Sequence, residues 1–506
     1  MVVFKTLKKV NMGDTIAHFL IDEQNHVEWM VYPSKFESKV VLPVNQRDAF
    51  SLVQAKLWKD AYDKNFSNGM TMFNSQTARG ITLIKQSVHD TSEKLEVDTS
   101  LKDEHGNLYL HHVLREYQSN RLEVWITFTN KTNTVEKLEF LPSFMLSGIS
   151  PFYYKQISGN LKLVKIRSKW SMEGRVEKKK IEQYDLEPSW KESGMALEKI
   201  EQHGSMPVRQ FFPVMGIYDQ RFDVTWMAEL DARASWQLNV SRIGDRLQMF
   251  GGLPDRDDGN WFKIIKPNGT YTTPKAYLTV GTGNIEKISR RLQKRKIISN
   301  LPIVYNEWAT TWGNPNEKLI HDSLKLLKNH QIDTYVIDAG WYESKSGDFN
   351  AGIGDWNVDL NKFPNGFNKI VDDIHQQGFK AGIWYEFEGI GNESKMYQKN
   401  ELQVTRDGWP VTTLKRRFLD LTNLNVKKFL KIKLFDQLKK AKFDYLKVDY
   451  NDSIGIGADG ADSDAEGVQK QVDETIRIFK KLYENLPNLV IESCSSGGAS
   501  INNSFY

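Results

Sequence analysis

The chain has 506 residues, of which 40% are hydrophobic, 26% charged and 12% aromatic. This composition is that of a folded globular protein and excludes a disordered chain, and the length favours two or three domains. With 68 basic and 64 acidic residues the net charge is only +4, which argues against a nucleic-acid partner. No run of about 18 apolar residues is present, so we expect no membrane-spanning helix and no membrane partner.

Two features of the sequence bear on the cellular compartment. The single cysteine, Cys494, excludes an internal disulfide and fits a reducing environment. Residues 1–9 lack the apolar segment of a signal peptide. We therefore expect a cytoplasmic location.

Residues 1–283 show the pattern of antiparallel β structure. Apolar and polar side chains alternate along residues 121–129, and after a turn at 130–133 the alternation resumes at Leu138 and Phe140. Residues 267–269, Pro-Asn-Gly, mark a further turn. Many short strands without a long helical period predict an N-terminal antiparallel β-sandwich over residues 1–283.

Two basic segments interrupt this pattern. Residues 175–182 are dense in charge, and we expect a solvent-exposed edge or loop there. Residues 284–300 are predicted to form a linker helix with Ile285, Ile288 and Leu292 on one face. Its basic side chains are expected to face water, namely Arg290, Arg291, Lys294, Arg295 and Lys296.

From residue 301 onward, short apolar strands alternate with amphipathic helices. The predicted strands are residues 302–305, 335–338, 381–385, 445–449 and 489–493, and the predicted helices are residues 318–330, 367–377, 426–440 and 468–484. Such alternation predicts a parallel sheet, either doubly wound or closed as a (β/α)8 barrel. No glycine fingerprint follows the first strand, which disfavours a dinucleotide-binding fold.

Polar and aromatic side chains gather where these strands end. The carboxyl ends of parallel strands meet at one edge, so these side chains are expected to share one cleft. They are Asn306, Glu307, Trp308, Asp338, Trp341, Trp384, Glu386, Glu388, Lys447, Asp449, Glu492 and Cys494. A glycosidase needs such a set, because carboxylates act as acid and nucleophile while indole faces cover the C–H surface of a sugar.

Lys447 and Asp449 are the most informative pair. Residues two apart on a strand point to the same side, so the ammonium and the carboxylate are expected to be neighbours. A neighbouring cation keeps a carboxylate ionised, which suits a nucleophile and not a general acid. The alternative is an ion pair that only closes the top of the sheet. Glu386 and Glu388 are interpreted as partners of Lys447 and of pocket hydroxyls, with an acid pair as the alternative.

Seven motifs, in order, resemble those of glycoside hydrolase family 36, the α-galactosidases. They include Asp338-Ala339-Gly340-Trp341 and Lys447-Val448-Asp449. The complete set covers residues 266–274, 332–342, 354–366, 382–388, 419–423, 444–449 and 492–498. The resemblance is clear from about residue 260 to 498 and weaker upstream.

The resemblance implies a retaining α-galactosidase in which Asp449 is the nucleophile and forms a covalent galactosyl-enzyme. It also implies that Lys447 and Asp338 bind sugar hydroxyls. The other implied substrate-binding residues are Trp308, Trp341, Trp384, Cys494 and Gly497. The implied substrate is an α-galactoside oligosaccharide, with no metal and no organic cofactor, and by analogy with the family the protein is a homo-oligomer.

The chain departs from the family pattern at three places. Ala339 stands where members commonly carry an aspartate, and residues 498–500 lack a common arginine, with Ser500 in its place. Retention requires a second carboxyl group, yet we find no candidate general acid after Glu492. We therefore expect residues 301–506 to hold about the first five βα units of a (β/α)8-type barrel, in an incomplete and poorly active chain.

These departures leave two alternatives open. Ala339 and Ser500 motivate a related α-glycosidase such as an α-N-acetylgalactosaminidase. The lack of a general acid motivates a sugar-binding remnant without catalysis.

Overall fold

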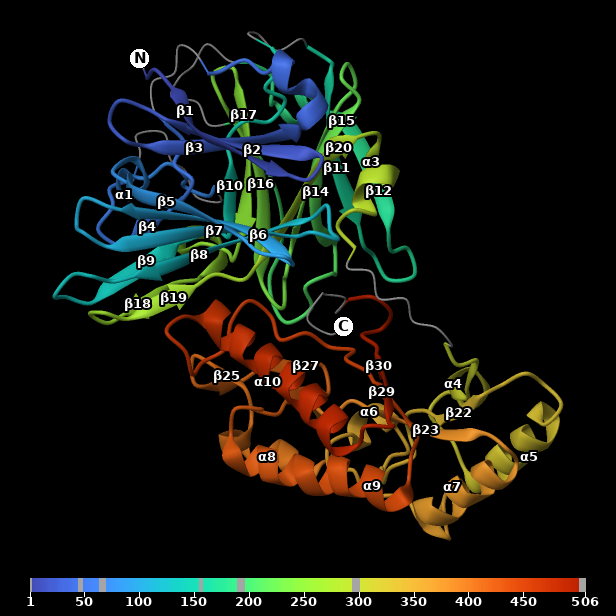
Figure 1. Cartoon of the computed structure of the whole chain (residues 1–506). Helices are drawn as coiled ribbons and strands as arrows, with labels where there is room; N and C mark the ends of the chain where they lie inside the picture. Colours follow the sequence, from blue (N-terminus) through green and yellow to red (C-terminus); the bar gives the residue numbers. More distant parts are fainter. Residues whose placement is uncertain are drawn as a thin grey trace. The chain divides into compact units, whose positions relative to one another are not determined.

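The computed structural model describes residues 2–43, 49–62, 70–153, 158–188, 196–293 and 301–499 (Figure 1). The chain divides into two compact units. The first consists of Met1–His203 and Pro207–Arg295, and the second of Gly204–Met206 and Lys296–Tyr506. No sequence pattern indicated that Gly204–Met206 belong to the second unit.

The first unit is built from antiparallel sheets. A ten-stranded sheet runs in the order β12 (Arg175–Lys180), β11 (Leu161–Arg167), β14 (Phe211–Asp219), β15 (Val224–Leu230), β20 (Ala276–Thr282), β8 (Leu122–Thr129), β7 (Leu108–Glu116), β6 (Lys94–Lys102) and β5 (Thr82–Asp90), with β19 (Thr270–Thr272) also on β8. A four-stranded sheet contains β10 (Phe144–Leu146), β17 (Arg246–Gly252), β16 (Trp236–Ile243) and β13 (Ala196–Gln202). Two three-stranded sheets contain β1 (Lys5–Met12), β2 (Thr15–Ile21) and β3 (Val27–Pro33), and β18 (Lys263–Ile265), β9 (Glu136–Phe140) and β4 (Lys56–Leu57). Its short helices are α1 (Gln76–Arg79), α2 (Arg256–Gly259) and α3 (Ile285–Ser289).

The strand predictions for this unit are confirmed where the alternation was clearest. On β8 the four apolar side chains of the predicted face are buried, and β9 buries Leu138 and Phe140 in the same way. The charge-dense segment forms β12, which among the described strands pairs with β11 alone and is largely exposed. It is therefore an exposed edge strand, as expected, and its charges protect it from pairing with another chain.

The predicted linker helix is shorter in the structure. Helix α3 ends at Ser289, although Ile285, Ile288 and Leu292 are buried together as predicted. The prediction that Arg291 faces water is wrong, because its guanidinium lies 2.5 Å from the carboxylate of Asp14 and its side chain is only 14% exposed. Lys294, Arg295 and Lys296 lie outside the described residues.

The second unit contains a five-stranded sheet in which every pairing is parallel (Figure 1). Its order is β21 (Val304–Asn306), β22 (Thr334–Ile337), β23 (Lys380–Tyr385), β29 (Tyr445–Val448) and β30 (Val490–Ser493). The helices are α4 (Trp308–Thr311), α5 (Glu317–Leu327), α6 (Phe349–Gly352), α7 (Gly366–Gln376), α8 (Leu424–Leu430), α9 (Gln437–Ala441) and α10 (Asp464–Asn485). All five predicted strands are present, and they follow one another across the sheet in sequence order.

Two local features were not predicted. The expected helix at 426–440 is α8 and α9 joined by a π-helical segment, Lys431–Asp436. Between β23 and α8 lie the short strands β24 (Gly389–Gly391), β25 (Thr405–Arg406), β26 (Trp409–Pro410), β27 (Thr412–Thr413) and β28 (Arg416–Phe418). Strands of two or three residues are too short to show a period of two, so the sequence pattern could not reveal them.

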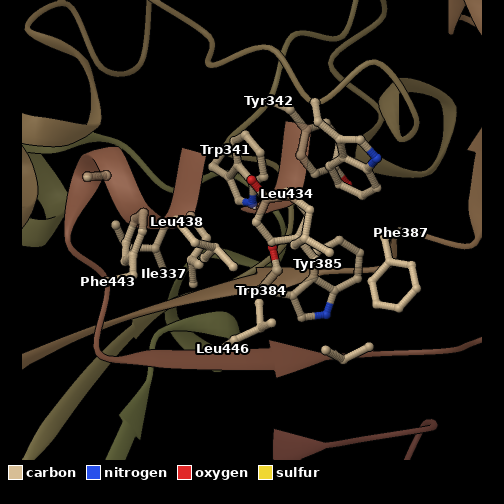
Figure 2. Close-up of a cluster of buried hydrophobic side chains, with 14 of the residues drawn as sticks. Ile337, Trp341, Tyr342, Trp384, Tyr385, Phe387, Leu434, Leu438, Phe443 and Leu446 are labelled. Atoms are coloured by element: carbon tan, nitrogen blue, oxygen red, sulfur yellow. Dashed lines mark hydrogen bonds between the residues drawn. The ribbon is translucent and has the colours of Figure 1, made fainter. Parts of the chain in front are cut away.

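An aromatic core supports the carboxyl ends of the central strands (Figure 2). The indole of Trp341 has no exposed surface, and its Nε1 donates to the carbonyl oxygen of Trp384 at 2.9 Å. The rings of Trp341 and Tyr385 meet edge to face with centroids 5.1 Å apart, and Leu434 of the π-helical segment is buried in the same cluster. Because aromatic rings in such contacts are densely packed, the residues at the end of β23 sit on a rigid base.

Candidate active site

Asp338, directly after β22, lies in a cluster of three hydrogen-bond donors. Its Oδ2 accepts from Asn306 Nδ2 at 2.7 Å and from Lys447 Nζ at 2.9 Å, and its Oδ1 accepts from the backbone N–H of Ala339 at 2.8 Å. The side chain of Asp338 is 4% exposed and that of Lys447 is 15% exposed. A carboxylate with three donors is fixed in orientation and keeps about one of its roughly four acceptor sites for a further donor.

Lys447 reaches Asp338 across the intervening strand β23. Burial disfavours the charged ammonium, but the charge and hydrogen bond of Asp338 outweigh burial, so the pKa of Lys447 lies above its ordinary value. Asp449 contributes in the same direction. The lysine therefore remains protonated. Its direct partner is Asp338, whereas Asp449, the neighbour predicted from the sequence, acts on it through its charge alone.

Asp449 follows β29, and four donors surround its carboxylate. Oδ1 accepts from the backbone N–H groups of Tyr450 at 2.9 Å and Ser496 at 3.1 Å. Oδ2 accepts from Asn451 Nδ2 at 2.9 Å and from Trp384 Nε1 at 3.2 Å. Burial raises the pKa of Asp449, but these hydrogen bonds and the charge of Lys447 outweigh it and hold the pKa below its ordinary value. Asp449 is therefore an ionised, firmly oriented carboxylate.

Glu386 is not a partner of Lys447, which corrects the interpretation made from the sequence. Its Oε1 accepts from Arg416 at 2.6 Å, and its Oε2 accepts from Asn451 Nδ2 at 2.8 Å. Arg416 belongs to β28, one of the short strands that the sequence pattern did not reveal. Glu386 thus links β28 to Asn451, whose side chain also donates to Asp449.

Three buried glutamates have raised pKa values. Burial raises the pKa of Glu307 to about 7 and that of Glu388 to about 8, and it raises the pKa of Glu386 as well. A raised pKa suits a general acid, but Glu307 is 1% exposed and its oxygens accept from the backbone N–H of Asp338 and from the Thr311 hydroxyl. With its acceptors engaged and no exposed surface, Glu307 orients Asp338 and does not face a leaving group.

The predicted aromatic walls differ in accessibility. Trp308 is partly exposed and packs edge to face against Trp312 and Phe349. Trp384 is 1% exposed, and its indole N–H points to Asp449. Trp341 is fully buried, so its ring supports Trp384 from the core and offers no face to a ligand. This corrects the expectation that Trp341 contacts sugar.

Cys494 and Gly497 lie in the loop after β30. The backbone N–H of Cys494 donates to the carbonyl oxygen of Val448 at 2.7 Å, which fixes this loop beside the end of β29. Burial, followed by the charge of Asp449, raises the pKa of the Cys494 thiol to about 12, so the group is a neutral thiol and not a nucleophile. Gly497 has φ = 114°, a conformation that favours glycine in the turn that presents the Ser496 N–H to Asp449. Ser500 lies outside the described residues.

Comparison with known proteins shows what this chain is similar to. A family model described as Melibiase matches residues 270–505. An α-galactosidase of Pediococcus pentosaceus is 30% identical over 244 residues, which cover 46% of this chain and 34% of that protein. A solved glycoside hydrolase family 36 α-galactosidase, a variant of AgaA from Geobacillus stearothermophilus in complex with raffinose, superposes with a TM-score of 0.81 at 15% identity, over 99% of this chain and 74% of that chain. Residues 270–505 are thus similar to the Melibiase family, and the fold of the chain is similar to that of a family 36 α-galactosidase.

Two further α-galactosidases show the same similarity. A Lactobacillus acidophilus enzyme is 27% identical over 256 residues, which cover 48% of this chain and 35% of the enzyme. The solved Lactobacillus brevis α-galactosidase has a TM-score of 0.75 at 17% identity, covering 100% of this chain and 72% of that one. The matched segments span only about a third of these curated relatives, and the structural likeness establishes the multidomain fold of family 36. Within the described part of the chain, no helix is both long and apolar enough to cross a membrane.

The first unit also has a group of possible metal ligands. Ligand atoms of Glu201, His203 and Asp258 lie within 4.8 Å of one another. The ammonium of Lys199, however, is 2.9 Å from the Glu201 carboxylate and also ion-pairs with Asp258. Because an internal cation already neutralises these carboxylates, we assign no metal to this group.

Four side chains of the site were missed or given no role by the sequence reasoning. Asn451 follows Asp449 by two residues, so the spacing that paired Lys447 with Asp449 could have found it. Asn306 was recognised at a strand end without a function. Arg416 lies on the three-residue strand β28 and Ser496 in the loop after β30, and no local pattern predicts where either segment lies.

Proposed function

We propose that the protein is a retaining α-galactosidase that hydrolyses terminal α-galactosyl residues of oligosaccharides through a covalent galactosyl-enzyme. The observation that carries this proposal is the Asp449 carboxylate, held by four donors at the carboxyl edge of a parallel sheet. An ionised and oriented carboxylate is what a glycosidase nucleophile requires. Asp338 and Lys447, joined at 2.9 Å, supply polar groups for sugar hydroxyls beside it.

In this mechanism a carboxylate oxygen of Asp449 forms a bond to the anomeric carbon. The glycosidic C–O bond breaks at the same time, and its electron pair departs with the leaving oxygen, which takes a proton from a general acid. Water then releases galactose from the enzyme with net retention. We assign the general acid to no residue of this chain.

The proposed substrates are raffinose-type oligosaccharides and smaller α-galactosides. The complex of the Geobacillus stearothermophilus relative with raffinose supports this class. Trp308, with part of its ring exposed, would line the pocket, and Cys494 and Gly497 would shape its side. Trp384, which is 1% exposed, would act through its hydrogen bond to Asp449 and would not wall the pocket as expected from the sequence. The proposal requires neither a metal nor an organic cofactor.

The strand order supports a (β/α)8-type barrel for the catalytic part. A doubly wound sheet reverses its order at a switch point, whereas β21, β22, β23, β29 and β30 follow one another without reversal. We therefore propose a β-sandwich over residues 1–283, a linker at 284–300 and about the first five βα units of a barrel at 301–506. A cytoplasmic location and a homo-oligomeric state are proposed with it, from the single cysteine and from the family resemblance.

The proposal is tested by hydrolysis of an aryl α-galactoside whose leaving group needs no protonation. Asp449→Asn keeps the shape of the side chain but removes the charge, and we expect at least about a thousandfold loss of rate. Asp436→Asn, at an exposed position in the π-helical segment, serves as the matched control and is expected to keep the rate of the unsubstituted chain. An Asp449→Asn variant that retains most of the rate would refute the mechanism.

The second candidate is an α-N-acetylgalactosaminidase. It is favoured by Ala339, which is 1% exposed and leaves no second carboxylate beside Asp338. Losing one hydroxyl acceptor costs about 1–3 kcal/mol of recognition, enough to relax selectivity for galactose. Comparing the rates of hydrolysis of an aryl α-galactoside and an aryl α-N-acetylgalactosaminide decides between the two activities. Calorimetric binding of galactose without turnover of either substrate would instead support a sugar-binding remnant.

A further inference from the structure

The side-chain amide of Asn451 lies between two buried carboxylates. Its Nδ2 is 2.9 Å from Asp449 Oδ2 and 2.8 Å from Glu386 Oε2, so both amide hydrogens are used. Its carbonyl oxygen accepts a hydrogen bond from the hydroxyl of Ser496. Because a carboxylate can only accept, the amide has one orientation that satisfies all three contacts.

Glu386 is itself fixed from the opposite side. Its Oε1 accepts from Arg416 at 2.6 Å and from the backbone N–H of Asn451 at 3.2 Å. Glu386 is 1% exposed and Arg416 is 6% exposed. With three donors on two oxygens and a buried guanidinium beside it, the Glu386 carboxyl group cannot rotate without leaving the charge of Arg416 unpaired.

We propose that Asn451 is a positioning residue for the nucleophile Asp449, and that Glu386, anchored by Arg416, fixes the amide of Asn451. This inference rests on the proposed function. Without Asn451 the Oδ2 atom of Asp449 keeps only the longer bond from Trp384, at 3.2 Å. The carboxylate can then rotate away from the line of attack, and a displacement of about 1 Å is enough to cost about a hundredfold in rate.

Replacing one oxygen of Glu386 tests whether Glu386, anchored by Arg416, fixes the amide of Asn451. In Glu386→Gln one of the two carboxyl oxygens becomes an NH2 group. If that group takes the Oε2 position, it faces the Asn451 amide nitrogen, and if it takes the Oε1 position, it faces Arg416 and the Asn451 backbone N–H. A donor meets a donor in both orientations, so glutamine cannot replace glutamate here although its size is the same.

The experiment measures how fast the full chain is labelled by a mechanism-based fluorosugar, an α-galactosyl fluoride with a second fluorine on the ring. Asp449 bonds to the anomeric carbon and fluoride leaves without a general acid, so intact-mass spectrometry follows the first chemical step alone. We expect Asn451→Ala to lower the labelling rate about 10–100-fold. Because the amide nitrogen and oxygen of Asn451 are engaged by protein groups, the Kd for galactose measured by calorimetry should change less than about threefold.

Two further variants separate positioning from general damage to the fold. Asn451→Ser keeps a donor for only one of the two carboxylates, loses less packing volume, and is expected to lower the labelling rate in the same way. Glu386→Gln should lower it as well. Arg417→Lys is the matched control, because Arg417 neighbours Arg416 on β28 but donates to Thr412 and to the carbonyl oxygen of Tyr397, and it should label at the unsubstituted rate.

The outcomes distinguish this inference from the proposed function. Labelling of the unsubstituted chain, with slow labelling and unchanged galactose affinity in the Asn451 variants, supports the inference. Equal labelling rates in Asn451→Ala, Asn451→Ser and the unsubstituted chain overturn it and leave the proposed function standing. Equal losses of rate and of galactose affinity also overturn it, because they indicate a structural role. An unsubstituted chain that takes no label overturns the proposed function, and the inference with it.

Discussion

At the scale of single residues, burial and hydrogen bonding act in opposite directions on Asp449. Burial raises its pKa, and the donors Ser496, Asn451 and Trp384 together with the charge of Lys447 lower it further than burial raises it. A carboxylate with a lowered native pKa stabilises the fold above its ordinary titration range, and this contribution is lost as the pH falls through the native pKa. The proposed nucleophile is thus ionised, and stabilising, at neutral pH.

Glu388 shows the opposite sign. Burial raises its pKa from 4.5 to about 8, and the neighbouring Glu386 adds to this. Between these two values the unfolded chain has lost the proton that the native state keeps, so stability falls as the pH rises. Glu388→Gln removes this loss of stability. We expect its free energy of unfolding to exceed that of the parent protein by about 3 kcal/mol at neutral pH.

Urea denaturation on either side of this range checks the prediction. The parent should lose stability as the pH rises from about 5 to about 8, and Glu388→Gln should lose clearly less. Glu484→Gln, at an exposed position on α10, is the control and should stay within about 0.5 kcal/mol of the parent. A Glu388→Gln variant with the same pH dependence as the parent would contradict the assignment.

At the scale of elements, the parallel register brings the site together. Trp384 on β23 lies directly opposite Lys447 on β29, and Asp338 follows β22, the other neighbour of β23. The Lys447 side chain therefore crosses the end of β23 to meet Asp338. Helix α4 and the loop after β30 add Trp308 and Ser496 at the same edge.

The backbone of the loop after β22 is tightly constrained at Gly340. Gly340 has φ = 94°, and a Cβ atom there would overlap the carbonyl oxygen of Gly313. We expect Gly340→Ala to cost about 3 kcal/mol or more, from backbone strain and overpacking together. Gly347→Ala is the control, since Gly347 also has a positive φ, 77°, but no atom lies within 4 Å of the added carbon.

Gly347→Ala should cost only about 1–2 kcal/mol, the strain contribution alone. Thermal unfolding of the two variants followed by circular dichroism measures the difference. Equal stabilities would show that the contact between residues 313 and 340 does not constrain this loop.

At the scale of the whole molecule, the sequence was informative wherever a pattern extended over several residues. Alternation along β8 and the five βα repeats predicted antiparallel structure followed by a parallel sheet, and the spacing of Lys447 and Asp449 indicated the site. Arg416 could not be found this way, because it lies on a three-residue strand far along the chain from the carboxylate it supports. Trp341 was placed in the pocket because no pattern distinguishes an indole that faces a ligand from one that faces the core.

The central claim is that Asp449 is the nucleophile, and peptide mapping of the fluorosugar-labelled chain tests it most directly. After labelling, proteolysis and tandem mass spectrometry locate the carboxyl group that carries the sugar. The account predicts a single labelled site, Asp449, and no label in Asp449→Asn. A sugar attached to Asp338, Glu386 or any other carboxylate, or an unlabelled chain, would contradict it.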